Sequence, residues 1–414
     1  MLHLPRLNVR FMQSGTRTDI GASTFFAFTW SVDTFSLQGE LRVDYSVTVI
    51  ACWGRTVFIP VETVPYVRLA KRLFLGRGDL RAVADDEEIL CPDERTSSRP
   101  AIFLPGQLDR VTGTPSESSR EAEIAAVTSP ESFHSATIAY HISDAALVDG
   151  SVYVGHHRHF VADKALFANV ASEPRHLTGA ALASSFYGTK YFCHWLVDDC
   201  TRYLLAEASG QPLCLRTPYS HRQQYQAYLK QDWTPTERAR IDHLVVYRDF
   251  DQNSLKKKRY EVLRDRIRER FPSKGGERFV YIRRGRSGTP RLIQDEDSII
   301  DALVKRGFVI VDVVSDSLEQ ILATLVDARI VVSLEGSHIG HCAVAIPKNS
   351  GLLLLQPPDR FSAHTRGWAE CMDIRFGFVV GATGANGYQF SYAEVLRTVD
   401  LMMRSIANGH ILAA

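Results

Sequence analysis

The chain has 414 residues, which is long for one small domain and suits two or three domains of about 150 residues each. Its 48 Lys and Arg residues balance 47 Asp and Glu residues, so the formal net charge of +1 favours neither a histone-like protein nor an acidic-tail protein. No segment approaches the ~18 apolar residues that cross a bilayer, and the first residues do not resemble a signal peptide. These features favour a globular cytoplasmic protein.

The first part of the chain is predicted to be rich in β-strands. Residues 24–32 mix aromatic residues with Thr, residues 43–49 alternate apolar and polar side chains, and residues 56–59 form a short apolar run. From residue 97 to residue 132, Pro, Ser, Thr and charged residues dominate, which is typical of a loop or linker. We therefore expect a β-rich region with a Ser/Pro-rich linker over residues 1–130.

The rest of the chain is predicted to form α/β domains over residues 131–254 and 255–414. The second of these alternates short apolar strands with helices, as a parallel sheet with crossover helices does. Its expected strands span residues 278–282, 308–313, 330–333 and 352–355, and its expected helices span residues 255–270, 296–306, 317–326 and 392–406. In such sheets, ligands bind at the carboxyl ends of the strands.

A cluster of arginines follows the first strand of this sheet. Arg283, Arg284, Arg286 and Arg291 alternate there with glycines. Guanidinium groups bind phosphate through paired hydrogen bonds, and glycine lets backbone N–H groups approach an anion. Because the cluster lies where an open α/β sheet holds its ligand, it predicts a phosphate site.

A second candidate segment follows the strand at residues 330–333 and contains Glu335, Gly336, Ser337 and His338. Small residues here would open a helix whose N-terminus favours an anion, and Glu335 or His338 could contact a sugar or a nucleobase. The segment has neither the Gly-x-Gly-x-x-Gly pattern of dinucleotide-binding proteins nor the Lys-Ser/Thr of a Walker loop. Neither NAD nor ATP chemistry is therefore indicated, and we expect no cofactor.

A third candidate group lies on a helix predicted over residues 191–208. His194, Asp198 and Arg202 are spaced by four residues and would share one face of that helix. A His beside a carboxylate can remove a proton from a hydroxyl group, or Asp198 can take the proton itself while Arg202 pairs with it. The group is therefore either a site with His194 or Asp198 as a candidate base, or an ordinary i, i+4 pair on the helix surface.

Several elements in order resemble glycosyltransferase family 61, whose members include capsular polysaccharide biosynthesis proteins. Tyr191-Phe-Cys-His194-Trp195-x-x-Asp198 is similar to the family's Tyr/Phe-x-His-Trp/Phe-x-x-Asp element. Further matches are the strand-end Arg283-Arg284, the Arg-x-Ile-x-x-Glu pattern of Arg291 to Glu296, Gly307-Phe308, Leu318-Glu-Gln320 and Gly336-Ser337. The resemblance extends from about residue 137 to residue 360. Asp295 departs from it, because family members usually have Asn before the glutamate.

The resemblance implies an α/β protein with a GT-B-like pair of Rossmann-type domains, here preceded by the β-rich region. The domain at residues 131–254 would bind the acceptor, a glycan or lipid-linked glycan, and residues 255–414 would bind a nucleotide-sugar. The implied reaction is inverting and metal-independent, in capsule or lipopolysaccharide assembly on the cytoplasmic side. We expect His194 and Asp198 to be catalytic and the following residues to bind the donor: Arg283, Arg284, Arg291, Glu296, Glu335, Gly336, Ser337 and His338.

Three alternatives remain open on the sequence alone. Asp249 and Asp251 form an Asp-x-Asp pattern after a predicted strand, as in metal-dependent GT-A transferases, where carboxylates hold Mn²⁺ or Mg²⁺. A protein with this fold could also bind glycans or a partner without catalysis. The basic run from Lys256 to Arg259 could contact nucleic acid or anionic lipid, although interrupting acidic residues favour a solvated helix and no nucleic-acid partner.

Overall fold

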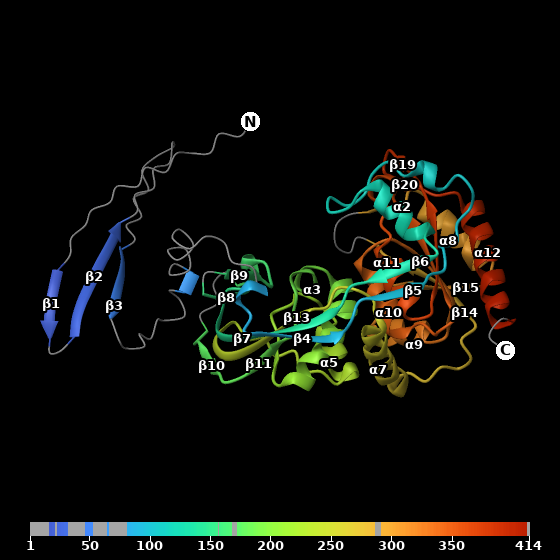
Figure 1. Cartoon of the computed structure of the whole chain (residues 1–414). Coiled ribbons are helices and arrows are strands. Elements are labelled where there is room, and N and C mark those ends of the chain that lie inside the picture. The colour runs from blue at the N-terminus through green and yellow to red at the C-terminus, as the bar shows by residue number, and fades with distance from the viewer. Residues whose placement is uncertain are drawn as a thin grey trace. The chain divides into compact units, whose positions relative to one another are not determined.

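The computed structural model describes residues 16–20, 23–31, 46–52, 64–65, 81–155, 157–167, 172–285 and 291–411 (Figure 1). The chain divides into two compact units, Met1–Thr63 and Val64–Ala414. The domain boundaries expected at residues 130 and 254 stay predictions. Among the described residues, no helix combines the length and apolar character needed to span a membrane.

The first unit contains an antiparallel three-stranded sheet. Its strands β1 (Thr16–Ile20), β2 (Ser23–Ser31) and β3 (Ser46–Cys52) pair in that order. The strands predicted at residues 24–32 and 43–49 are confirmed, the latter shifted toward the C-terminus. The strand predicted at residues 56–59 lies outside the described residues.

The second unit contains a fully parallel sheet, as predicted, with a fifth strand at Arg375–Val380 in addition to the four that were predicted. Its spatial order is β15-β14-β16-β17-β18. The strand that follows β14 in the chain is thus added on one side of the β14–β16 pair, and the strands that follow β16 are added on the other side. The crevice between the carboxyl ends of two such strands is the usual ligand site in open α/β sheets. The strands are β14 (Arg278–Arg283), β15 (Phe308–Asp312), β16 (Ala328–Leu334), β17 (Gly351–Gln356) and β18 (Arg375–Val380).

Helices cover both faces of this sheet. Successive side chains of each strand point to opposite faces, where they join two separate hydrophobic clusters. Val332 and Leu353 face one cluster with Met402, whereas Val331 and Leu352 face the other with Ile321. Burying a side chain of this kind stabilises the fold by about 1.5–3 kcal/mol. The helices of this region are α8 (Glu296–Val304), α9 (Leu318–Leu325), α10 (Gly340–Ala345), α11 (His364–Cys371) and α12 (Tyr392–Ile411). The capping box predicted from Ser317 and Gln320 is confirmed at the start of α9.

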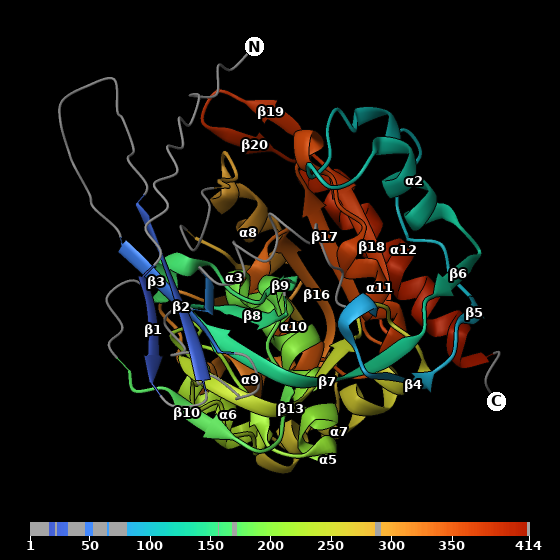
Figure 2. The same cartoon turned by 60° about the vertical axis from the view of Figure 1, so that its left-hand side comes forward.

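A second, eight-stranded sheet is mixed rather than parallel, which differs from the expected second Rossmann-type domain. Its long strands β7 (Thr137–Val148) and β13 (Arg238–Arg248) pair antiparallel (Figure 2). Asp149 and Gly150, with φ of 46° and 73°, form a two-residue hairpin turn that sends β8 back along β7. The other strands are β4 (Asp86–Cys91), β8 (Ser151–Val154), β9 (His157–Phe160), β10 (Arg175–Leu177), β11 (Ala180–Leu182) and β12 (Pro212–Leu213).

The segment predicted as a loop or linker contains one helix, α2 (Arg120–Thr128), and residues 98–119 before it are largely irregular. The segment lies between β5 (Glu94–Ser97) and β6 (Glu131–His134) and packs beside β18 and α11 (Figure 2). The backbone of Ile102 exchanges hydrogen bonds with Phe376 and Phe378, each of 3.0 Å. The helix and this packing were not predicted, because the residues that the segment contacts lie far along the chain.

The helix predicted at residues 191–208 is divided into three parts. These are α4 (Phe192–His194), a π-helical turn η5 (Trp195–Asp199) and α5 (Cys200–Ser209), which ends at Gly210 as predicted. The short helix α3 (Phe186–Lys190) precedes them, and α6 (Arg222–Leu229) and α7 (Ser254–Arg270) follow. Single π turns occur frequently at functional sites.

Candidate active site

A cavity of about 540 Å³ opens at the carboxyl ends of β14 and β16, where the parallel sheet predicts a ligand site. We call it the basic cavity, because Lys190, Arg284, Arg291 and Arg360 line it together with Ser337 and His338. The cavity is large enough for a nucleotide. Such a set of cations, concentrated at one point of the molecule, favours an anionic ligand.

Glycines let this cavity form. A Cβ at Gly336 would lie 2.9 Å from Arg284 Nε and 3.1 Å from His338 Nδ1, so glycine leaves room for both side chains. A Cβ at Gly340 would lie 2.9 Å from the Cα of Cys193, so glycine lets the helix after β16 contact the segment that carries His194. The segment from Gly336 to Gly340 therefore packs against Arg284 at its start and against the segment that carries His194 at its end.

The predicted donor-binding residues differ in whether they line the basic cavity. Arg291 lines it and pairs with Glu335. Arg283 does not line it; its Nε lies 3.3 Å from Glu296, which also accepts a 2.8 Å hydrogen bond from the Tyr281 hydroxyl. The structure thus brings Arg284, Arg291, Ser337 and His338 together and leaves Arg283 and Glu296 outside.

His338 has a defined protonation pattern. The Ser333 hydroxyl donates to the Ile282 carbonyl at 3.0 Å, so it accepts from His338 Nε2 at 2.7 Å. Burial, together with nearby Arg284, lowers the pKa of His338 well below its usual value, so the ring is neutral and Nδ1 is an acceptor. Within the described part of the chain, this buried Nδ1 has no hydrogen-bonding partner. It is suited to a ligand hydroxyl.

A second cavity, of about 300 Å³, adjoins the basic cavity. We call it the histidine cavity, because His194 and His364 line it, with their ring centroids 4.5 Å apart. Arg291 and Arg360 line both cavities, so these two arginines share the histidine cavity with His194. The other shared residues are Tyr191 and Ser337.

His194, Asp198 and Lys256 form a hydrogen-bonded chain. His194 Nδ1 lies 2.7 Å from one carboxylate oxygen of Asp198, and the fully buried Lys256 ammonium lies 2.6 Å from the other. Burial raises the pKa of Asp198, but Lys256 and the bond with His194 outweigh it and hold that pKa well below the usual range. Asp198 therefore stays ionised and accepts the Nδ1 proton, which leaves Nε2 of His194 available as a proton acceptor.

The expected pairing of Arg202 with Asp198 is wrong. Arg202 instead pairs with Asp199 at 3.1 Å, and both side chains are buried. The π turn changes the helical register between Asp198 and Arg202, so only His194 and Asp198 share the predicted contact.

The proposed metal ligands Asp249 and Asp251 do not form a site in the described residues. Both oxygens of Asp249 are bonded to the Arg259 guanidinium, at 2.7 and 2.8 Å, and one also accepts from Thr137. Asp251 accepts from the backbone N–H of Ser135 at 2.9 Å. The Asp249 carboxylate is thus neutralised inside the protein, and this Asp-x-Asp pattern does not fit a divalent cation.

Replacing Asp249 with Asn is expected to destabilise the fold by about 3–5 kcal/mol, because it leaves the Arg259 charge buried without its partner. Urea denaturation measures this loss. The matched control Asp251→Asn is expected to lose only about 1 kcal/mol, because it affects one backbone hydrogen bond. Normal stability in both variants, with loss of divalent-metal binding, would restore the metal-site interpretation.

The basic run at the start of α7 is not an exposed cationic face. Lys256 and Arg259 are buried and paired with Asp198 and Asp249, and Lys257 pairs with Asp373 at 2.9 Å. The burial of Lys256 and Arg259 disfavours the nucleic-acid and lipid interpretations of this run, of which Lys258 is exposed. Its charges stabilise two buried carboxylates instead.

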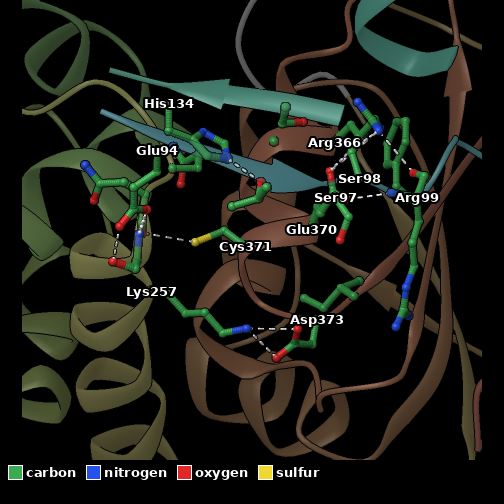
Figure 3. Close-up of a pocket in the computed structure, with 18 of the residues that line it drawn as sticks. Glu94, Ser97, Ser98, Arg99, His134, Lys257, Arg366, Glu370, Cys371 and Asp373 are labelled. Atoms are coloured by element: carbon green, nitrogen blue, oxygen red, sulfur yellow. Dashed lines mark hydrogen bonds and ion pairs between the residues drawn. The ribbon is translucent and has the colours of Figure 1, made fainter. Parts of the chain in front are cut away.

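A further cavity of about 410 Å³ lies between β5, α7 and α11 (Figure 3). Carboxylates and cations lie side by side in it: Lys257 contacts Asp373 at 2.9 Å, and Arg366 lies 3.6 Å from Glu370. Glu94 accepts from the Ser254 backbone at 2.7 Å. Ser98 donates to Glu370 at 2.7 Å. This internal pairing contrasts with the concentration of cations in the basic cavity.

A comparison with protein families agrees with this geometry. Residues 192–353 match the family model described as glycosyltransferase 61. This part of the chain is similar to glycosyltransferase family 61. This confirms the resemblance found in the sequence and supports a glycosyltransferase enzyme, and a family of this activity implies in general a nucleotide-sugar donor and a glycan acceptor. No curated protein matches the chain.

The matched residues 192–353 contain every site residue predicted from the sequence, but other residues around the cavities were missed. Arg360 follows β17, a predicted strand, so its position at a strand end was a usable signal. Tyr187 and His364 line the histidine cavity from α3 and α11. Lys256 was interpreted as part of a surface run, because its burial depends on the tertiary fold.

Proposed function

We propose that the protein is an inverting, metal-independent glycosyltransferase that moves a sugar from a nucleotide-sugar to a glycan hydroxyl. The observation that carries this proposal is that two arginines line both cavities, one of which contains His194. Arg291 and Arg360 line the same space as His194, so a phosphate-binding group and a proton acceptor face one another across it. Inverting transfer needs both, one for the leaving group and one for the acceptor hydroxyl.

His194 is the base in this proposal, and Asp198 orients it. Asp198 is held ionised by Lys256, so it is a poor proton acceptor, whereas Nε2 of a neutral imidazole that donates from Nδ1 can accept a proton. His194 removes the proton of the acceptor hydroxyl as that oxygen attacks the anomeric carbon from the face opposite the leaving diphosphate. The ionised Asp198 then stabilises the imidazolium, as a carboxylate does beside a catalytic histidine.

The departing nucleoside diphosphate is stabilised by cations of the basic cavity. Arg284, Arg291 and Arg360 supply guanidinium donors, and Ser337 lies at the start of the short helix η6 (Ser337–Ile339). Positive groups fixed before the reaction stabilise charge that develops in the transition state. Arginines in this number can replace a divalent cation, which supports metal independence. His338 Nδ1 is available for a hydroxyl group of the donor.

The wider setting is proposed from the family resemblance. The parallel sheet at residues 278–380 would form the donor-binding half of a GT-B-like arrangement, and the mixed sheet would belong to the acceptor-binding half. A glycan or lipid-linked glycan acceptor, capsule or lipopolysaccharide assembly and a cytoplasmic site at the inner face of the membrane belong to this proposal.

The proposal is tested by incubating the protein with a panel of nucleotide-sugars and simple glycoside acceptors, with and without EDTA. We expect release of nucleoside diphosphate that depends on acceptor and is unchanged by EDTA, and a product of inverted anomeric configuration by ¹H NMR. Loss of activity with EDTA, or retention of configuration, would contradict the mechanism. Nucleotide binding without any transfer would instead indicate a binding protein.

A further inference from the structure

We propose that Tyr187 and Tyr191 form a stacking platform for the sugar ring of the acceptor, an inference that rests on the proposed transferase function. Both side chains line the histidine cavity beside His194. Nothing else described above requires aromatic residues at these two positions. The platform would place the acceptor hydroxyl near the candidate base.

The two rings are exposed and nearly parallel. Tyr187 is 40% exposed and Tyr191 is 36% exposed, although large aromatic side chains usually lie inside a fold. Their ring planes differ by 16° and their centroids lie 6.5 Å apart. The His194 ring lies 5.4 Å from Tyr187 and 5.9 Å from Tyr191. Two exposed aromatic rings thus adjoin the proton acceptor, and the Lys190 ammonium lies 5.3 Å from the centroid of the Tyr191 ring.

The short helix α3, which carries Tyr187, is firmly anchored. The Ser185 hydroxyl accepts from Gly188 N at 3.1 Å, and Ser185 also donates to the buried Asp199 carboxylate. A Cβ at Gly188 would lie 1.9 Å from Asp199 Oδ2, so only glycine allows this close packing. The Tyr219 hydroxyl donates to the Gly188 carbonyl at 2.7 Å. These contacts hold the aromatic surface in place before a ligand arrives, which lowers the entropic cost of binding.

The chemistry around the rings fits a sugar. A pyranose has an apolar face of C–H groups, which can pack on an aromatic ring, and a rim of hydroxyl groups. Glu117, Ser118 and Ser362 line the same cavity and can accept hydrogen bonds from such a rim. The cations concentrate in the adjoining basic cavity, so the diphosphate belongs there and the acceptor ring belongs beside His194.

The test measures binding of a panel of methyl glycopyranosides by saturation-transfer NMR and binding of nucleoside diphosphates by calorimetry. In Tyr187→Ala we expect affinity for the best glycoside to fall about fivefold to tenfold, the size expected for loss of one aromatic contact. Tyr187→Phe keeps the ring and is expected to bind as the wild type does. Tyr392→Ala, which removes a 57% exposed tyrosine of α12, is the matched control and should change nothing.

Each outcome separates this inference from the proposed function. Weaker glycoside binding with unchanged nucleotide binding in Tyr187→Ala supports the platform. Unchanged glycoside binding in that variant overturns it, and so does a wild-type protein that binds none of the glycosides. If Tyr187→Ala weakened nucleotide binding and left glycoside binding unchanged, the proposal would also be overturned, because the rings would then contact a nucleobase. A wild-type protein that binds glycosides but no nucleotide would contradict the transferase function while the platform stands.

Discussion

Replacing His194 with Gln is expected to lower turnover by about 10²–10⁴-fold, the contribution of a positioned general base. The side chain is 23% exposed, so its loss leaves no large buried gap and the fold should persist. Nucleoside diphosphate binding should be unchanged, because His194 lines the histidine cavity and not the basic cavity. Initial rates of nucleotide release, with calorimetry on the same sample, measure both quantities.

A second His-Asp pair provides the matched control. His176 lies 2.7 Å from Asp242 on the mixed sheet, away from both cavities, and both side chains are exposed. His176→Gln should therefore keep full activity. If His194→Gln retains wild-type turnover, His194 is not the base. Asp198→Asn is a poorer test, because it leaves the buried Lys256 without its ionised partner and we expect it to destabilise the fold.

Replacing Arg360 or Arg291 with Ala is expected to weaken nucleoside diphosphate binding about 10–100-fold each. A hydrogen bond to a charged group contributes about 1.5–3 kcal/mol, which corresponds to this range of affinity. Both residues line the basic cavity, and Arg360 is exposed, so its removal should not disturb the fold. Calorimetric titration with UDP, GDP, CDP and TDP measures the loss.

Arg283→Ala is the control for this experiment. Arg283 adjoins Arg284 in the sequence, but it pairs with Glu296 and Asp297 and lines neither the basic nor the histidine cavity. Its removal should leave nucleotide affinity within about twofold of the wild type, which is the effect of a surface charge. If Arg283→Ala abolished binding while Arg360→Ala did not, the phosphate site would lie at the edge of β14 instead of in the cavity.

The sequence predicted the parallel sheet and part of the site for the same physical reason. Fully buried strands are short apolar runs, and loops at their carboxyl ends carry ligand-binding residues, so β14 and β16 directed attention to Arg284 and Ser337. The His194–Asp198 contact was predicted because four residues make about one helical turn. Both patterns are local in the chain.

Contacts between distant residues were not predicted. Lys256 pairs with Asp198, and Arg366 donates to the Arg99 carbonyl. These partners lie far apart in the sequence, so no local sequence pattern indicates that they meet. The π turn at Trp195–Asp199 has no sequence pattern that we used, and it moved Arg202 to Asp199. The Asp149-Gly150 turn, in contrast, carries a recognisable hairpin signal that would have predicted the antiparallel part of the mixed sheet.

The most direct test is a crystal structure of the protein with the nucleoside diphosphate that binds most tightly. We predict that its phosphates contact Arg291 and Arg360 beside Ser337, with open space between the terminal phosphate and His194. Phosphates bound in the cavity of Figure 3, near Lys257 and Glu370, or at any other place remote from His194, would contradict the account.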